Sequence, residues 1–214
     1  MKKSDENIFT EQNNDDVIDN EAVDALSSEP KKNVFFMSLL EQVELAVIVF
    51  AIIVIVFSFA FRTCRVSGPS MENTLYDGEN VIITDLFYTP KRGDIVVFHQ
   101  TGGKYNEPIV KRVIGLPGDT VKIEYFTDTM KVTVTDKDGN KSVLNETYIK
   151  YNGYPYYYNN SITEVEDGTV FVMGDNRNNS ADSRSDDIGL VDTRRILGKI
   201  VFRFSPLTKI GAVR

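Results

Sequence analysis

Seventeen consecutive uncharged residues, Leu45 to Phe61, form the longest apolar run of this 214-residue chain. Extended back over Val43 and Glu44, a helix here reaches the roughly 20 residues needed to cross a bilayer. A core helix of a soluble protein is disfavoured, because the run is apolar on every face and shows no amphipathic period. A cleaved signal peptide is disfavoured too, because the run is too long and starts too late in the chain. We therefore predict an uncleaved transmembrane helix over residues 42–61.

The net charge is concentrated before this anchor. Residues 1–44 hold four lysines and eleven acids, which accounts for the whole net charge of −7. Since residues 1–33 offer few apolar side chains for a core, we predict a disordered acidic tail there. The remainder of the chain is neutral overall, so the sequence does not indicate a basic nucleic-acid binder, and we expect no nucleic-acid partner.

The chain contains one cysteine, Cys64, and one histidine, His99. A single cysteine excludes a disulfide scaffold. One cysteine and one histidine cannot supply the usual four ligands of a zinc site. We expect no metal and no other cofactor.

Residues 62–214 are predicted to be mainly β, because short β-branched runs alternate with Gly and Pro turns. An Asp-Gly-Asn turn at residues 138–140 indicates a hairpin between two of these runs. The predicted strands cover residues 81–83, 94–98, 109–114, 120–123, 131–135, 142–144 and 169–173.

A serine hydrolase built on this chain needs a base other than an ordinary catalytic histidine, because His99 at a strand end is typical of a surface residue. Gly68 and Pro69 break the chain just before Ser70 and would expose it as a nucleophile. Lys111 lies within an apolar strand, where desolvation would favour the neutral amine that a lysine base requires. Each pattern alone also fits a plain turn and a charged edge strand.

A third segment, residues 174–184, is polar and follows the strand at residues 169–173. Such a run also fits a solvated loop or a calcium site, but the EF-hand spacing is absent. Taken in order, the anchor and four blocks resemble the bacterial type I signal peptidases over residues 45 to about 205. The blocks are Gly68-Pro69-Ser70-Met71 with Thr74-Leu75, Arg92-Gly93-Asp94-Ile95-Val96, Lys111-Arg112-Val113-Ile114-Gly115-Leu116-Pro117-Gly118-Asp119, and residues 174–184.

The resemblance implies a Ser-Lys serine protease that removes signal peptides. By it, Ser70 is the nucleophile, with its N–H in the oxyanion hole, and Lys111 is the general base. Ser180 would orient the lysine, and Asp182 and Arg184 would form a supporting ion pair.

The resemblance also implies the fold, the substrates and the location. It implies a mainly β, open, coiled-sheet catalytic domain over residues 62–214 outside the cytoplasm, with the N-terminus inside and a smaller inserted β region at 120–168, as in compact Gram-positive members. The substrates would be secretory preproteins, cut after a small-x-small motif and bound as an added strand. Membrane lipid is the other expected partner, without an obligate protein partner. The predicted pocket consists of Val66, Gly68, Met71, Leu75, Ile109 and Val110.

Two positions depart from the family pattern. Asn73 stands where the family often has proline, and an asparagine can hold a turn. Gly68 stands where some members have a serine whose hydroxyl is a second oxyanion donor. Ser67 is adjacent but is expected to point to the other face, which leaves that donor unassigned.

Two other functions were weighed. A self-cleaving repressor-type protease shares the Ser-Lys arrangement but needs a DNA-binding segment, for which residues 1–33 are too acidic. A non-catalytic, membrane-anchored β binding module is disfavoured because both Ser70 and Lys111 are present. Positively charged residues flank the anchor on both sides, so the positive-inside rule does not fix its orientation.

Overall fold

The computed structural model describes residues 31–100, 107–153 and 159–213. The chain divides into two units, Met1–Ile53 and Val54–Arg214. Residues 1–30 of the predicted tail lie outside the described part. Residues 31–33, which we had assigned to the tail, belong to the first helix.

Helix α2 spans Lys31–Ala60 and contains an apolar stretch, Phe35–Ala60, that is long enough to cross a membrane. At about 1.5 Å per residue, these 26 residues extend about 39 Å, more than the hydrocarbon core requires. The helix begins eleven residues before the predicted start at residue 42. Residues 31–41 contain no proline or glycine, and from Phe35 onward they extend the apolar stretch. Large apolar side chains such as Phe50 and Phe59 are exposed along it, as a lipid-facing helix requires.

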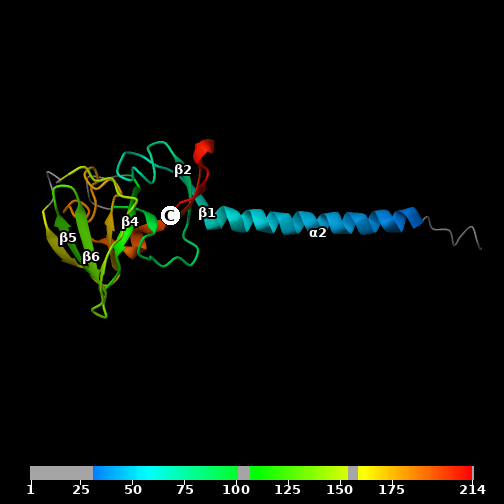
Figure 1. Ribbon diagram of the computed structural model, residues 1–214. Helices are drawn as coiled ribbons and strands as arrows, with labels where there is room; N and C mark the ends of the chain where they lie inside the picture. Colours follow the sequence, from blue (N-terminus) through cyan, green and yellow to red (C-terminus); the bar gives the residue numbers. More distant parts are fainter. Residues whose placement is uncertain (1–30, 101–106, 154–158, 214) are drawn as a thin grey trace, which may run out of the picture. The chain divides into compact units, whose positions relative to one another are not determined.

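The Val54–Arg214 unit is mainly β, which confirms the predicted fold class. Its larger sheet has the order β1-β2-β11-β3-β4-β9-β10, with β12 paired to β11, and all of its pairs are antiparallel. Figure 1 shows β1, β2 and β4 of this sheet. The strands are β1 (Phe61–Arg65), β2 (Asn80–Thr84), β3 (Ile95–Phe98), β4 (Ile109–Gly115), β9 (Thr169–Met173), β10 (Val191–Asp192), β11 (Ile196–Ser205) and β12 (Gly211–Ala212), with 3-10 turns at Thr193–Arg195 and Leu207–Lys209.

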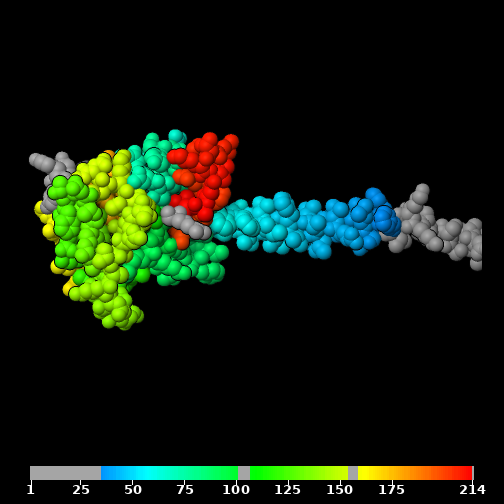
Figure 2. Space-filling view, in the orientation of Figure 1, coloured from blue at the N-terminus to red at the C-terminus, as the bar shows by residue number. Residues whose placement is uncertain are grey.

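A second, four-stranded sheet has the order β7-β6-β5-β8. Its strands are β5 (Thr120–Tyr125), β6 (Met130–Thr135), β7 (Lys141–Val143) and β8 (Ser161–Glu164). The predicted hairpin turn at residues 138–140 joins β6 to β7, and its yellow-green tip projects at the lower edge of the unit in Figure 2. Residues of β5 and β6 pack with Ile114, Phe171 and Met173 in one core cluster, which joins the two sheets.

The larger sheet is packed on both faces, which explains why β3 is buried at every position. Ile95 and Val97 belong to one core cluster, and Val96 and Phe98 belong to another. Strand β4 alternates in the same way, since Val110 joins the first cluster and Val113 joins the second. Because both faces of β4 are packed, a charged side chain in this strand must lie in the protein interior or line a cavity.

Strand β11 is the longest strand and was not predicted, and neither were β1, β8, β10 and β12. The sequence of β11 does not show a clear strand pattern, because Gly198, Lys199 and Arg203 interrupt the apolar residues. Lys199 pairs with Asp94 at 2.5 Å, and Arg203 pairs with Glu79 at 2.9 Å, so both cations are neutralised at the sheet. Bulges within β11 absorb the irregular spacing.

Candidate active site

Ser70 lies at the start of a tight turn that follows β1. Gly68 has a φ of +83°, which few residues other than glycine adopt, and its N–H donates to Asp77 at 2.8 Å. The turn is closed by the Glu72 N–H to Pro69 O bond at 3.1 Å. Met71, directly after the serine, is buried in the core and anchors the turn, so Ser70 is held at its surface.

The departure at Asn73 has a structural reason. Asn73 has a φ of +85°, which proline cannot adopt, and its side chain donates to Ile149 O at 2.9 Å. This bond joins the turn at residues 69–74, which carries the predicted nucleophile Ser70 and is called the nucleophile turn below, to the segment after β7.

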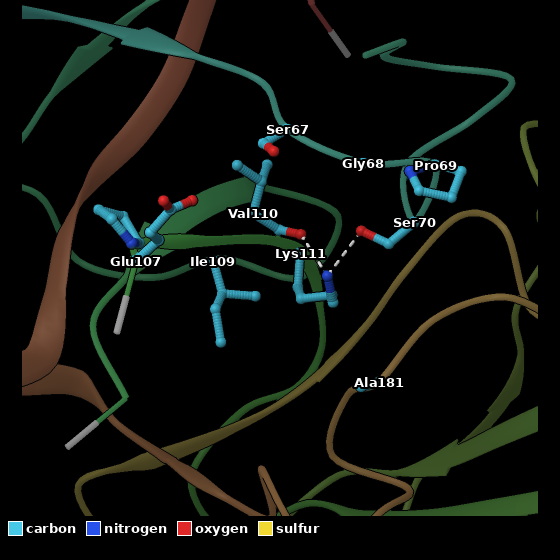
Figure 3. Close-up of a pocket in the computed structure, with 10 residues that line it drawn as sticks. Ser67, Gly68, Pro69, Ser70, Glu107, Ile109, Val110, Lys111 and Ala181 are labelled. Carbon is cyan, nitrogen blue, oxygen red and sulfur yellow. Dashed lines mark hydrogen bonds between the residues drawn. The ribbon is translucent and has the colours of Figure 1, made fainter. Parts of the chain in front are cut away.

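Lys111 is positioned by β4 and is only 3% exposed. It pairs with Val96 of β3, while the pairing of β4 to β9 begins at Arg112. The Lys111 Nζ lies 2.8 Å from Ser70 Oγ and also donates to Val110 O at 2.8 Å. Figure 3 shows both contacts, with Ser70 and Lys111 directed toward each other.

Burial lowers the pKa of Lys111 from 10.5 to about 8, because desolvation disfavours the charged amine. The charges of Asp182 and Asp175 oppose this shift, and that of Arg184 adds to it. With a pKa of about 8, about one lysine in ten is neutral at pH 7, compared with fewer than one in a thousand for a free side chain. The site therefore supplies a usable amine base beside a hydroxyl.

A cavity of about 380 Å³ adjoins this pair. Of the predicted pocket residues, Gly68, Ile109 and Val110 line it. The described residues that line it do not include the other three, Val66, Met71 and Leu75, which are buried in the core cluster that also holds Val110. The full lining is Ser67, Gly68, Pro69, Ser70, Glu107, Pro108, Ile109, Val110, Lys111 and Ala181.

The expectation that Ser67 faces away from the cavity was wrong. Strand alternation does not apply, because residues 66–69 follow the end of β1 and form no strand. Ser67 is among the residues that line the cavity and is drawn with them in Figure 3. The N–H of Gly68 is bound by Asp77, so it is not a free donor toward the cavity.

The polar segment after β9 packs against the nucleophile turn. Asp182 accepts two hydrogen bonds from the Arg184 guanidinium, each 2.8 Å, and one from the Gly174 N–H at 2.9 Å. Ser180 is buried and its hydroxyl also bonds Asp182. A Cβ on Gly174 would stand 2.5 Å from Ser70 O and would collide with Ser180, so only glycine permits this approach.

Our sequence reasoning missed a second buried pair. Arg112 binds Asp175 through Nε at 2.9 Å and through Nη2 at 2.6 Å, and its guanidinium lies 3.9 Å from the ring centre of Tyr148. Arg177 likewise binds Glu146. A signal existed for the first pair, since Arg112 interrupts an apolar strand and Asp175 lies two residues after a buried strand. The sequence around Glu146 and Tyr148 has no feature that would predict their contacts with Arg177 and Arg112.

Comparison with known proteins decides the family. The profile described as "Signal peptidase, peptidase S26" matches residues 39–205. This chain belongs to the signal peptidase family. Signal peptidase IB of Staphylococcus aureus strain Mu50 is 36% identical over 190 residues, covering 80% of this chain and 92% of the relative. Signal peptidase I of Bacillus licheniformis is also 36% identical, over 84% of this chain and 94% of the relative.

Among solved structures, a signal peptidase I from Enterococcus faecalis matches with a TM-score of 0.38 and 27% identity. The match covers 52% of this chain and 97% of that chain. Membership of this peptidase family makes the protein a serine endopeptidase. His99 is exposed at the end of β3 and is not among the described residues that line the cavity.

The Asp182–Arg184 pair generates a stability prediction. Asp182→Asn leaves the Arg184 guanidinium buried and uncompensated, and removing one partner of such a pair typically costs about 3–5 kcal/mol. The measurement is urea unfolding at pH 7 followed by circular dichroism. The pairing lowers the pKa of Asp182, so this contribution is present above the unfolded value of 3.8 and is lost as pH falls below it.

Asp192→Asn is the matched control. Asp192 and Arg194 have the same spacing, and their carboxylate–guanidinium contact is 2.5 Å, but the arginine side chain is 87% exposed. Solvent screens that pair, so its loss should leave the urea midpoint nearly unchanged. Equal midpoints for the two variants would contradict the structural role of the Asp182–Arg184 pair.

Proposed function

We propose that this protein is a membrane-anchored signal peptidase that cleaves secretory precursors with Ser70 as nucleophile and Lys111 as general base. The observation that carries the proposal is the 2.8 Å contact between Lys111 Nζ and Ser70 Oγ, made by a buried lysine whose pKa is lowered to about 8. A salt-bridged lysine would remain charged, and no ion pair to Lys111 is present among the described residues.

In the proposed reaction, Ser70 Oγ attacks the scissile carbonyl while the neutral Lys111 amine takes the hydroxyl proton. The resulting ammonium then protonates the departing amine, which leaves an acyl-enzyme. In the second half Lys111 takes a proton from a water, whose oxygen attacks the acyl carbon. The ammonium then returns the proton to Ser70 Oγ as the bond to the acyl group breaks. The Ser70 N–H would stabilise the tetrahedral oxyanion.

Ser180, Asp182 and Arg184 would support this pair from below. We infer that Ser180, buried beside the turn and bonded to Asp182, limits the positions available to the lysine amine. The Asp182–Arg184 pair in turn fixes the segment that carries Ser180. Their role is to keep the reacting atoms aligned.

The substrate would bind as an extended strand against the edge of β4 at Ile109 and Val110, which β9 leaves unpaired. The facing wall of the cavity is Ser67, Gly68 and Pro69. Val66, Met71 and Leu75 would act from beneath, as a rigid floor that limits the depth of the pocket. A shallow floor of this kind favours small residues before the cleaved bond, as in a small-x-small motif.

We propose that α2 anchors the protein in the cell membrane as a single span, in contact with lipid. The N-terminus would lie in the cytoplasm and the peptidase outside it, where precursors emerge. Protease added to intact spheroplasts should then digest an epitope at the C-terminus and spare one at the N-terminus, as read on immunoblots. Digestion of the N-terminal epitope instead would reverse the orientation.

The alternative binding module is not favoured by the site. A module that only binds gains nothing from a desolvated lysine against a serine hydroxyl, since burying the amine costs stability. A repressor-type protease would need its DNA-binding segment among residues 1–30, which lie outside the described part.

Catalysis by the dyad predicts which substitutions abolish cleavage. Ser70→Ala and Lys111→Arg should each reduce cleavage of a secretory precursor at least a thousandfold, because arginine stays protonated at any working pH. N-terminal sequencing of the product checks that the cut removes the signal peptide. His99→Ala, which alters an exposed residue at the end of β3, should retain activity; its inactivation while folded would transfer the role of base to His99.

The lowered pKa predicts the pH dependence. kcat/KM on a soluble peptide should rise from pH 7 to 9 with a single ionisation near pH 8, since the neutral amine is the active form. Ser180→Ala should lower the rate. A profile whose only inflection lies near pH 6.5 would point to a histidine instead.

Stability offers an independent check on the same pKa. Because the folded value is below the unfolded value of 10.5, the unfolded chain binds more protons between pH 8 and 10.5, and stability rises with pH across that window. Below pH 8 the destabilisation that comes from burying the charged Lys111 amine is fully present. Lys111→Met should therefore unfold at higher urea than the parent at pH 7.

A further inference from the structure

Asn176, a residue with no role so far, connects the segment after β9 to both carbonyls of the nucleophile turn. Its side-chain Nδ2 donates to Pro69 O at 3.1 Å, and its backbone N–H donates to Ser70 O at 3.0 Å. It is 4% exposed. Two consecutive peptide units, one on each side of Ser70 Cα, are thus held by a single residue more than 100 positions away in the chain.

The orientation of the Asn176 amide is dictated by its partners. Nδ2 also donates to Glu72 Oε2 at 3.3 Å, and both Pro69 O and this carboxylate can only accept. Glu72 is held in turn by Lys150 Nζ at 2.6 Å. The backbone of Asn176 is bridged to Lys150 and follows Asp175, which Arg112 holds. Asn176 is therefore a rigid support.

Because the peptide is planar, the hydrogen bond to Pro69 O also sets the direction of the Ser70 N–H. The Pro69–Ser70 peptide is trans, since the only cis bond among the described residues is Ser205–Pro206. In a planar trans peptide the C=O and the N–H point in opposite directions. A donor that holds Pro69 O on the side of Asn176 therefore directs the Ser70 N–H to the opposite side. In the described part of the chain, no acceptor takes that N–H.

Pro69 O accepts one other hydrogen bond, which comes from within the turn itself. The Glu72 N–H to Pro69 O bond closes the turn on itself and moves with it as a unit. Among the described residues, only Asn176 fixes the plane of the Pro69–Ser70 peptide relative to the segment that carries Ser180 and Asp182. The backbones are in direct contact there, because a Cβ on Gly174 would reach Ser70 O at 2.5 Å.

We propose that Asn176 is a positioning residue that fixes the Pro69–Ser70 peptide plane and so directs the Ser70 N–H at the oxyanion of the tetrahedral intermediate. The inference rests on the proposed function, in which Ser70 is the nucleophile. Asn176 touches no reacting atom and acts through the peptide that it holds.

The test uses the full-length protein in detergent and two substitutions. Asn176→Asp keeps the shape but replaces the donor by an acceptor that faces Pro69 O and the Glu72 carboxylate. Asn176→Ala removes the side-chain donor but keeps the backbone hydrogen bond to Ser70 O. It therefore tests the role of the donor even if Asn176→Asp does not fold. Loss of one oxyanion donor costs about a hundredfold to a thousandfold in kcat. A misdirected donor should cost about tenfold to a hundredfold, with KM within twofold.

A second measurement separates positioning from general damage. A peptide aldehyde that forms a tetrahedral adduct with Ser70 should lose affinity by the same factor as kcat/KM. Binding of uncleaved peptide, compared between Ser70→Ala and Ser70→Ala with Asn176→Ala, should be unchanged. The apparent pKa of the pH–rate profile should also stay at the parent value in Asn176→Ala, because Asn176 does not contact Lys111 in the described structure.

Asn178→Ala is the matched control. It lies on the same segment but donates to Gly153 O at 2.9 Å, away from the nucleophile turn. It should keep parental kcat and aldehyde affinity.

The proposal is overturned if folded Asn176→Ala has parental kcat or if its affinity for the aldehyde is unchanged. It is also overturned if adding Asn176→Ala to Ser70→Ala weakens binding of the uncleaved peptide by the same factor as kcat/KM falls. Cleavage that persists in Ser70→Ala would defeat the proposed function itself. An inactive Ser70→Ala beside a fully active Asn176→Ala would defeat only the positioning role.

Discussion

The buried ion pair between Arg112 and Asp175 is the interaction on which the site depends. Arg112 follows Lys111 in β4, and Asp175 precedes Asn176 in the segment after β9. One bidentate contact therefore joins the strand of Lys111 to the segment that binds the turn of Ser70. Thr74, at the end of the nucleophile turn, donates to the same carboxylate. Three distant segments are therefore fixed to one another by a pair that is almost wholly shielded from water.

Sequence patterns were sufficient where local chemistry has a distinct signature. The anchor is visible because the bilayer requires length and apolarity together. The strand of Lys111 is visible because β-branched residues alternate there. The expected face agrees with the register, since Lys111 pairs with Val96, which packs in the cluster of Ile109 and Val113. The pairing of Ser70 with Lys111 came from resemblance, since neither pattern alone distinguishes a dyad from a turn and an edge strand.

The remainder required tertiary structure. Strand β11 is stabilised by partners on both sides and by ion pairs to Asp94 and Glu79, and none of these is visible in its own residues. The predicted pocket residues divide between the lining of the cavity and the core cluster, and a motif residue one layer below a cavity has the same sequence signature as one at its surface. Asn176 lies in a polar run of eleven residues, where only contacts show which amide bears a role.

The position of β11 in the sheet also orders events in time. This strand comes from the last part of the chain, yet it lies between β2 and β3, so the two halves of the sheet join only through it. A chain in which β11 has not yet formed cannot complete the sheet that positions Lys111 beside Ser70. Such non-local closure is the slow part of β folding. The sheet that carries Lys111 is therefore completed only after residues 196–205 have paired with both β2 and β3.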